Sequence, residues 1–122
     1  MPYQNQSPTD IKLHSKSKLL EITFDDGVSF SLSCEFLRVN SPSAEVRGHG
    51  PGQEVLQLDK EHVNITAIEP VGMYAVKLVF DDGHDSGLYS WQYLYELGEN
   101  KDEKWQDYLQ RLSQAGHQRK AD

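Results

Sequence analysis

Two stretches of alternating apolar and polar positions end in the same four residues, Phe-Asp-Asp-Gly, which begin at Phe24 and again at Phe80. Apolar side chains occupy positions 20, 22 and 24 before the first copy and positions 76, 78 and 80 before the second. An Asp-Gly pair between two alternating runs predicts a β-hairpin, because Gly adopts positive φ without steric cost. We therefore expect two related β-hairpin units as the framework of the fold.

Further extended segments surround these hairpins. The alternation predicts a strand over residues 10–15, a first hairpin over 19–24 and 28–32, an alternating run over 63–67, and a second hairpin over 74–80 and 86–89. Between them, Ser33 is placed to cap one helical turn over 34–38, and residues 44–47 suggest a brief extended piece. The glycines and proline at 48–52 indicate a loop, Leu56 and Leu58 have strand spacing on its far side, and residues 70–72 indicate a turn.

The C-terminal third has helical spacing. Ser90 is a suitable N-cap for a helix that Gly98 would end, and Asn100 with Glu103 has the spacing of a capping box for a second helix, which Gly116 would end. Apolar residues of the two helices recur at i, i+3, i+4 or i+7: Trp91, Leu94 and Tyr95 in the first, and Trp105, Tyr108, Leu109 and Leu112 in the second. The expected fold class is α+β: two related β-hairpin units with additional short strands, covered by C-terminal helices.

Length and charge restrict the function classes. A chain of 122 residues predicts one domain, here 10–116, with a flexible N-terminal arm (1–9) and a polar tail (117–122). No apolar run is long enough for a membrane span, and the first residues do not have the pattern of a signal peptide. A formal charge of −7 argues against nucleic acid and membrane as partners. The single cysteine, Cys34, excludes an intrachain disulfide, so we expect a cytoplasmic protein.

Two separate segments resemble the signature of a known family. Residues 36–49 read Phe-Leu-Arg-Val-Asn-Ser-Pro-Ser-Ala-Glu-Val-Arg-Gly-His, and residues 87–94 read Gly-Leu-Tyr-Ser-Trp-Gln-Tyr-Leu. Both are similar to motifs of the DUF971 family, which is named for its likeness to the N-terminal domain of gamma-butyrobetaine hydroxylase. The resemblance extends over residues 8–115 and implies the accessory domain alone, because the dioxygenase chemistry belongs to a separate jelly-roll domain. It also implies a context of metal-cofactor or iron–sulfur handling, since such domains occur fused to P-loop carriers.

The resemblance also indicates which residues match the zinc site found in related hydroxylases. In the eukaryotic hydroxylases this domain holds structural zinc through three cysteines and a histidine, and the matching positions here are Ser41, Ser43, Val46 and His84. Only the histidine remains. Serine hydroxyls and a valine cannot replace thiolates as zinc ligands, so we expect no zinc at that place.

The histidines leave a second metal hypothesis open. His49 lies in the glycine-rich loop, and His84 lies among Asp82 and Asp85, whose charges would attract iron or zinc. The alternative is that His84 is an exposed turn residue and His49 holds its own loop. No histidine begins the His-x-Asp or His-x-Glu pattern of a non-haem iron oxygenase, and the glycine-rich loop precedes a strand-like segment rather than the helix of a phosphate-binding loop.

An interaction surface is the other candidate site. The Ser-Pro-Ser segment contributes Arg38, Ser41, Ser43 and Arg47, and the aromatic helix contributes Trp91, Tyr93 and Tyr95. The competing interpretation is structural: Arg38 pairs with a carboxylate such as Glu45, and the aromatic residues are buried between the sheet and the last helix. Cys34 is either a buried small hydrophobe or a thiol of lowered pKa at a helix start.

Three functions follow from these observations. The first is a non-enzymatic accessory or protein-interaction domain with no catalytic residues and no cofactor, whose protein partner the sequence does not identify. The second is a small iron- or zinc-binding protein that uses His49 and His84. The third is an enzyme of unrecognised type. A homo-oligomer remains open in each case.

Overall fold

The computed structural model describes residues 7–48 and 54–119 of the chain, and it contains two antiparallel three-stranded sheets and four helices within those residues. The first sheet has the order β1-β2-β3 and the second the order β4-β5-β6, so each strand pairs with its neighbour in sequence. The strands are β1 (Pro8–His14), β2 (Leu19–Phe24), β3 (Ser29–Ser33), β4 (Ile65–Val71), β5 (Ala75–Phe80) and β6 (Leu88–Ser90). The expected α+β class is confirmed.

The two Phe-Asp-Asp-Gly copies form the same turn. Gly27 N donates to Phe24 O at 3.0 Å, and Gly83 N donates to Phe80 O at 3.2 Å. Both glycines have positive φ, 85° at Gly27 and 91° at Gly83, as the sequence predicts. The two units differ after this turn. Strand β3 begins soon after it, at Ser29, whereas β6 begins only at Leu88, and residues 84–87 form a loop.

The repeat continues into a capped helix after each sheet. Ser33 caps α1 (Cys34–Val39) and Ser90 caps α3 (Trp91–Glu99), and each hydroxyl accepts the N–H three residues later at 3.0 Å. Both helices end at an asparagine, Asn40 or Asn100, whose side-chain amide donates to the carbonyl oxygen four residues earlier. The repeated unit is therefore a hairpin, a capping serine and a helix that ends at asparagine.

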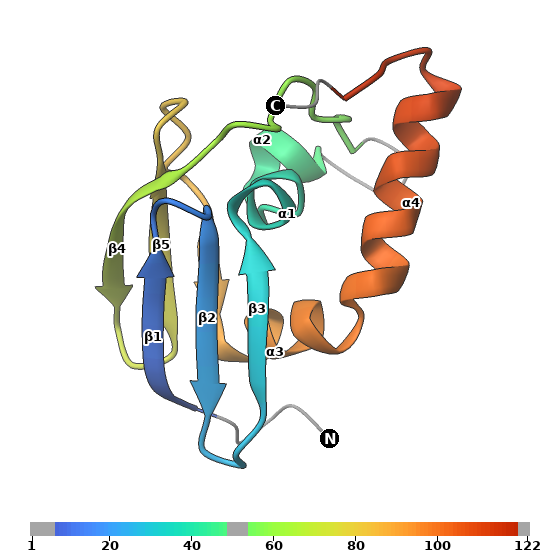
Figure 1. Cartoon of the computed structure of the whole chain (residues 1–122). Coiled ribbons are helices and arrows are strands. Elements are labelled where there is room, and N and C mark those ends of the chain that lie inside the picture. The colour runs from blue at the N-terminus through green and yellow to red at the C-terminus, as the bar shows by residue number, and fades with distance from the viewer. Residues whose placement is uncertain (1–6, 49–53, 120–122) are drawn as a thin grey trace.

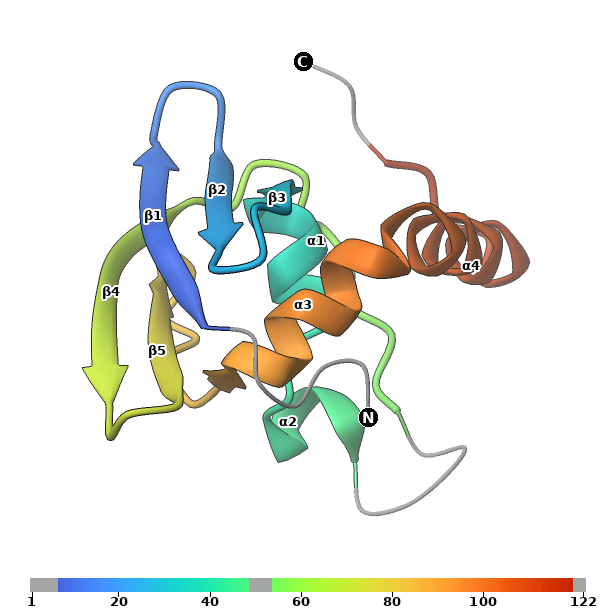
Figure 2. The ribbon, with the colours of Figure 1, turned by 90° about the horizontal axis from the view of Figure 1, so that it is seen from below.

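One hydrophobic core joins both units. It is built from the inward faces of β2 and β5 and from α1 and α3, and Figure 2 shows α1 and α3 lying side by side next to the sheets. Leu37 and Leu94, the fifth residue counted from each capping serine, are both fully buried. The alternating strand positions are at most 3% exposed: Leu20, Ile22, Phe24, Val76, Leu78 and Phe80.

Helix α4 (Lys101–Gln114) lies on the outer side of α1 and α3, away from the sheets (Figures 1 and 2). Its predicted apolar stripe faces inward: Tyr108 and Leu112 are buried and Trp105 and Leu109 are half-buried. Tyr108 Oη donates to Gln57 O at 2.7 Å, which attaches the segment before β4 to this helix. No helix in the described part of the chain is both long and apolar enough to cross a membrane.

Several local expectations were wrong. Residues 44–47 form a short helix, α2 (Ala44–Arg47), because Ser43 Oγ accepts the Glu45 N–H and caps it. Residues 54–64 contain no strand, and Leu58 is exposed. Strand β4 continues through Val71, and the turn follows at Gly72. Strand β1 begins at Pro8, two residues before the expected start.

The helix ends also differ from expectation. Gly98 lies inside α3, where it packs against Phe30: a Cβ at this position would come within 2.3 Å of the Phe30 ring. Asn100 makes no side-chain hydrogen bond that caps α4, because its amide donates back to Glu96 O and closes α3 instead. The predicted capping box is therefore absent.

Candidate functional site

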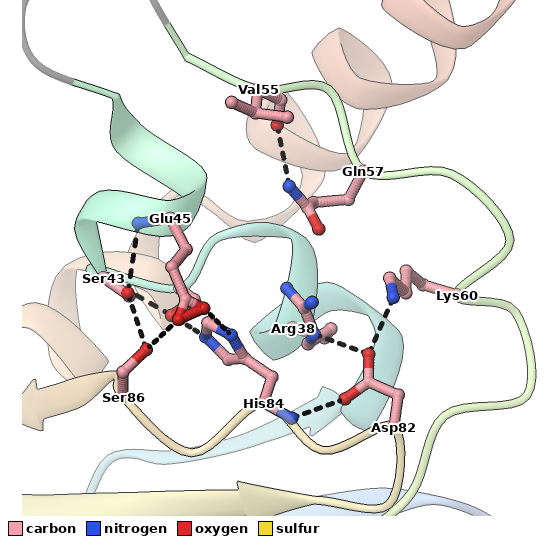
Figure 3. A network of polar contacts seen from close by, with 10 residues as sticks. Arg38, Ser43, Glu45, Val55, Gln57, Lys60, Asp82, His84 and Ser86 are labelled. Atoms are coloured by element: carbon pink, nitrogen blue, oxygen red, sulfur yellow. Dashed lines mark hydrogen bonds and ion pairs between the residues drawn. The ribbon is translucent and has the colours of Figure 1, made fainter.

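His84 is the buried centre of a polar cluster that reaches the surface at Glu45 and Ser86. We call it the serine–histidine cluster (Ser41, Ser43, Glu45, His84 and Ser86), and Figure 3 labels the last four of these residues. The His84 residue is 5% exposed. Its Nε2 lies 2.8 Å from Ser41 Oγ and its Nδ1 lies 3.5 Å from Glu45 Oε2. Burial lowers the pKa of His84, and the nearby Arg38 charge lowers this pKa further. The Glu45 and Asp82 carboxylates act to raise the same pKa, but the net shift is downward and favours the neutral imidazole.

Hydroxyl groups complete the cluster. Ser43 N donates to Ser41 Oγ at 3.3 Å, which leaves the Ser41 hydroxyl proton free to point at His84 Nε2. Ser43 Oγ lies 2.8 Å from Ser86 Oγ, and the Ser86 hydroxyl donates to Glu45 Oε1 at 3.0 Å (Figure 3). Together these bonds fix the connection between α1 and α2 onto the 84–87 loop of the second unit.

An ion-pair network lies beside this cluster. The Asp82 carboxylate accepts Arg38 Nε at 2.9 Å and Lys60 Nζ at 2.7 Å on the same oxygen, and His84 N donates to the other oxygen at 3.1 Å (Figure 3). Burial acts to raise the pKa of Asp82, but Lys60, the His84 N–H and Arg38 together lower it to about 2. The suggested pairing of Arg38 with Glu45 is wrong, because Glu45 contacts His84 and Ser86 instead.

Three of the four zinc positions implied by the resemblance, Ser41, Ser43 and His84, are connected by hydrogen bonds, but the chemistry of the set does not fit zinc. Ser41 and His84 are in direct hydrogen-bond contact, so a metal ion would have to break that bond before it could lie between them. Val46 is a buried apolar side chain, and a serine hydroxyl is not a zinc ligand in ordinary structural sites. Hydrogen bonds among Ser41, Ser43, Ser86 and His84 hold these residues in place.

The second metal hypothesis depends on His49, which lies outside the described residues, so its convergence with His84 stays a prediction. Asp82 is engaged by two cations, and Asp85 is exposed. Among residues 7–48 and 54–119, the one group of three metal-binding side chains with donor atoms within 4.8 Å of one another is Asp59, Glu61 and His117. His84, Asp82 and Asp85 do not form such a group.

Only part of the expected interaction surface is accessible in the structure. Four of its residues are buried, which contradicts an accessible role for them: Arg38, Ser41, Ser43 and Tyr95. The Tyr95 side chain is also fixed, because its Oη donates to Asp26. Their burial follows from the serine–histidine cluster and from the packing of α3 on the first sheet. The remaining members of the expected surface are exposed or half-buried: Arg47, Trp91 and Tyr93.

Cys34 is fully buried, and burial raises the pKa of its thiol. Its Sγ lies 3.6 Å from Asn64 Oδ1. The interpretation as a buried small hydrophobe is confirmed, and a reactive thiol is not supported.

Sequence reasoning missed several residues of these sites. Ser86 and Lys60 carry no local signal, because their roles depend on contacts with residues far away in the chain. Two further cations, Lys104 and Arg111, line a hollow beside α2 and could have been noticed, since a spacing of seven places both on one face of the predicted last helix. Met73 and Tyr74 form an exposed pair at the turn between β4 and β5, which stands out only once burial is known.

Three proteins of known structure are similar to this chain. A protein solved by NMR in solution is 58% identical, with a TM-score of 0.82, over 95% of this chain and 86% of that one. A second NMR structure is 52% identical, with a TM-score of 0.81, over 96% of this chain and 92% of that one. A crystal structure of a protein from Acidithiobacillus ferrooxidans, described as a DUF971-family member of unknown function, is 36% identical, with a TM-score of 0.63, over 75% of this chain and 91% of that one.

A family profile matches most of the chain. The profile described as gamma-butyrobetaine hydroxylase-like, N-terminal, matches residues 11–95, which include both sheets except the first residues of β1, the serine–histidine cluster and the start of α3. No curated protein matches the chain. With this profile and a DUF971 relative of 36% identity in agreement, the chain belongs to the DUF971 family of gamma-butyrobetaine hydroxylase-like N-terminal domains.

Proposed function

We propose that this domain is a non-enzymatic protein-interaction module that docks a partner protein through the turn between β4 and β5. The observation that carries the proposal is the exposure of two adjacent large side chains at that turn, 78% for Met73 and 72% for Tyr74. Leu88 of β6 and Val71 of β4 are also exposed on this sheet. We call these four residues, together with Trp91, the hairpin patch.

Hydrogen bonds from Trp91, the first residue of α3, fix the backbone of the turn between β4 and β5. Trp91 N donates to Tyr74 O at 2.9 Å, and Trp91 Nε1 donates to Met73 O at 2.9 Å. The exposed side chains therefore project from a fixed support, and less conformational entropy is lost on binding than with a free loop. Adjacent exposed aromatic and methionine side chains are enriched in the centres of protein interfaces.

The non-enzymatic part of the proposal rests on the polar groups. The side chains best suited to acid–base chemistry already have partners within the chain: His84 contacts Ser41 and Glu45, and Asp82 binds Arg38 and Lys60. These contacts explain the groups as structural connections between the two units. We also propose a cytoplasmic location, which the single, buried and unpaired Cys34 supports.

A photo-crosslinking experiment tests the hairpin patch. A photoreactive residue at position 73 is compared with one at position 55, where Val55 is 51% exposed but lies outside the patch. We expect a crosslinked partner protein from position 73, lost on Tyr74→Ser, and none from position 55. Equal crosslinking from both positions, or none from position 73, would contradict the proposal.

The identity of the crosslinked product separates two kinds of partner. A product containing a different protein supports the module as proposed, and that protein should bind the purified domain more weakly after Tyr74→Ser. A product that is a second copy of this chain, with a concentration-dependent dimer in solution, would replace the partner with self-association. Circular dichroism of each variant shows that the fold is intact.

A further inference from the structure

A hollow between α2 and α4 collects positive charge. It has a volume of about 560 Å³, and its lining includes Arg47 at the end of α2, and Lys104 and Arg111 of α4. A second hollow of about 570 Å³ shares the two α4 cations, but Glu103 and Asp107 also line it and oppose their charge. We call the first hollow the cationic groove. It lies among residues other than those of the hairpin patch, so the inference stands independently of the proposed function.

The charges of the groove are poorly compensated by the protein. Glu54 is the one carboxylate that lines the first hollow. Arg111 has a single ion pair, with Asp107 at the long distance of 3.8 Å, and Lys104 has no carboxylate partner among the described residues. Three cations that line one hollow repel one another and locally favour the entry of an anion, although the formal charge of the whole chain, −7, opposes it at long range.

The position of Arg47 is set by an aromatic ring. The centre of its guanidinium group lies 5.0 Å from the centroid of the Tyr93 ring, and Tyr93 Oη donates to Asn40 O at 2.6 Å. Burial raises the pKa of Tyr93, so the phenol is neutral and does not cancel the arginine charge. Stacking on a ring that is itself fixed orders the guanidinium before a ligand arrives.

The spacing of the cations indicates what they would bind. Lys104 and Arg111 are seven residues apart, about 10 Å along the helix, and Arg47 comes from the end of α2. Three cations against the single carboxylate of Glu54 favour an anion that carries more than one negative charge. The walls add the apolar side chains of Val39 and Val46, and the volume is that of a small-molecule site.

We propose that the cationic groove binds a small organic anion with at least two negatively charged groups, carboxylate or phosphate, joined by a compact body. One charged group contacts Arg47 and the other contacts Lys104 or Arg111. The body of the ligand lies against Tyr93 and the valines. No bond is made or broken in this process.

The test is a titration of ¹⁵N-labelled protein with citrate and with pyrophosphate, followed by amide and side-chain chemical shifts. We expect saturable shifts at Arg47, Tyr93, Lys104 and Arg111 with one or both probes, and the stronger probe distinguishes carboxylate from phosphate. Lys104→Gln and Arg111→Gln should each weaken binding about fivefold, and added salt should weaken it further.

The matched control is Lys12→Gln, which removes the same charge from β1, outside the groove. Equal weakening by Lys12→Gln would overturn the proposal, because binding would then follow net charge alone. So would the absence of saturation at about 10 mM of either probe, or binding of an acidic peptide at these residues with no response to small anions. Tyr74→Ser should leave the titration unchanged, so failure of one proposal does not decide the other.

Discussion

Arg38 Nε donates to Asp82 Oδ2 at 2.9 Å, and this bond connects the helix of the first unit to the turn of the second. The reciprocal bond is present as well: Tyr95 Oη, from the helix of the second unit, donates to Asp26 Oδ2 at 2.6 Å in the turn of the first. Arg38 and Tyr95 both lie five residues after a capping serine, and Asp26 and Asp82 are the same residue of the repeated motif. The two units therefore hold each other through equivalent positions.

The two aspartates differ in their surroundings, and we expect Asp82→Asn to be the more damaging change. The Asp82 side chain is 22% exposed and neutralises Arg38, which is 9% exposed and already has an unpaired buried Nη1. Loss of the carboxylate leaves a buried guanidinium unpaired, and unfolding should become easier by about 3 kcal/mol in urea titrations. Asp26→Asn, in the exposed equivalent turn, is the control and should cost less; equal losses would contradict the distinction.

His84→Ala should destabilise the fold without any metal being involved. The substitution opens a cavity and removes the imidazole that contacts the buried Ser41 hydroxyl. We expect a loss of about 2–4 kcal/mol in the free energy of unfolding. His14→Ala, at an exposed strand position, should have little effect. A chelator that destabilises wild type as much as His84→Ala does would point to a bound metal instead.

The stability of the folded state should decrease in mild acid because of His84. Burial lowers the pKa of His84 in the folded state, so below its ordinary value near 6.5 the unfolded chain takes up a proton that the folded chain does not. The contribution of His84 to stability is therefore complete above about pH 6.5 and declines as the pH falls, by at most about 1.4 kcal/mol per pH unit. Urea titrations between about pH 5 and 8 measure this slope. It should be smaller in His84→Ala, and an unchanged slope would assign it to other groups.

Gly27→Val and Gly83→Val should lower the free energy of unfolding by similar amounts. Both glycines have positive φ, and an added Cβ at either position would meet no atom within 4 Å, so the main penalty is backbone strain. We expect each change to lower the free energy of unfolding by about 1–3 kcal/mol. Thermal midpoints measure both, with Ser29→Val as an exposed strand control. A large loss in only one variant would show that the two turns are not equivalent in energy.

Gly98→Ala should destabilise although alanine is the better helix former. The added Cβ would come within 2.3 Å of the Phe30 ring, and such overpacking costs about 1–3 kcal/mol, more than the helix propensity of about 1 kcal/mol returns. In a Phe30→Ala background the clash is absent, so the same change should become neutral or stabilising. A double-mutant cycle measures this reversal, and an unchanged sign would show that the Phe30 contact does not decide the effect.

The candidate sites were partly visible in the sequence. The motif around Ser41, Ser43 and His84 was recognised, and these residues do meet, but as a hydrogen-bonded cluster that joins the units rather than as an accessible surface. Arg47 was identified alone, without the two α4 cations that share its groove. Exposure of Met73 and Tyr74 could not be inferred, because their apolar character is equally consistent with burial.

The sequence alone determined the features that depend on short-range chemistry. The repeated Asp-Gly turns, the strands beside them and the serine caps at 33 and 90 follow from backbone preferences that local residues satisfy by themselves. Tertiary structure decided the rest. Gly98 remains helical because the Phe30 ring occupies the space beside it. His84 is buried because the connection at 81–87, three residues longer than the equivalent one at 25–28, carries it to Ser41. Such outcomes depend on which distant side chains share a space, and no local pattern in the chain encodes that.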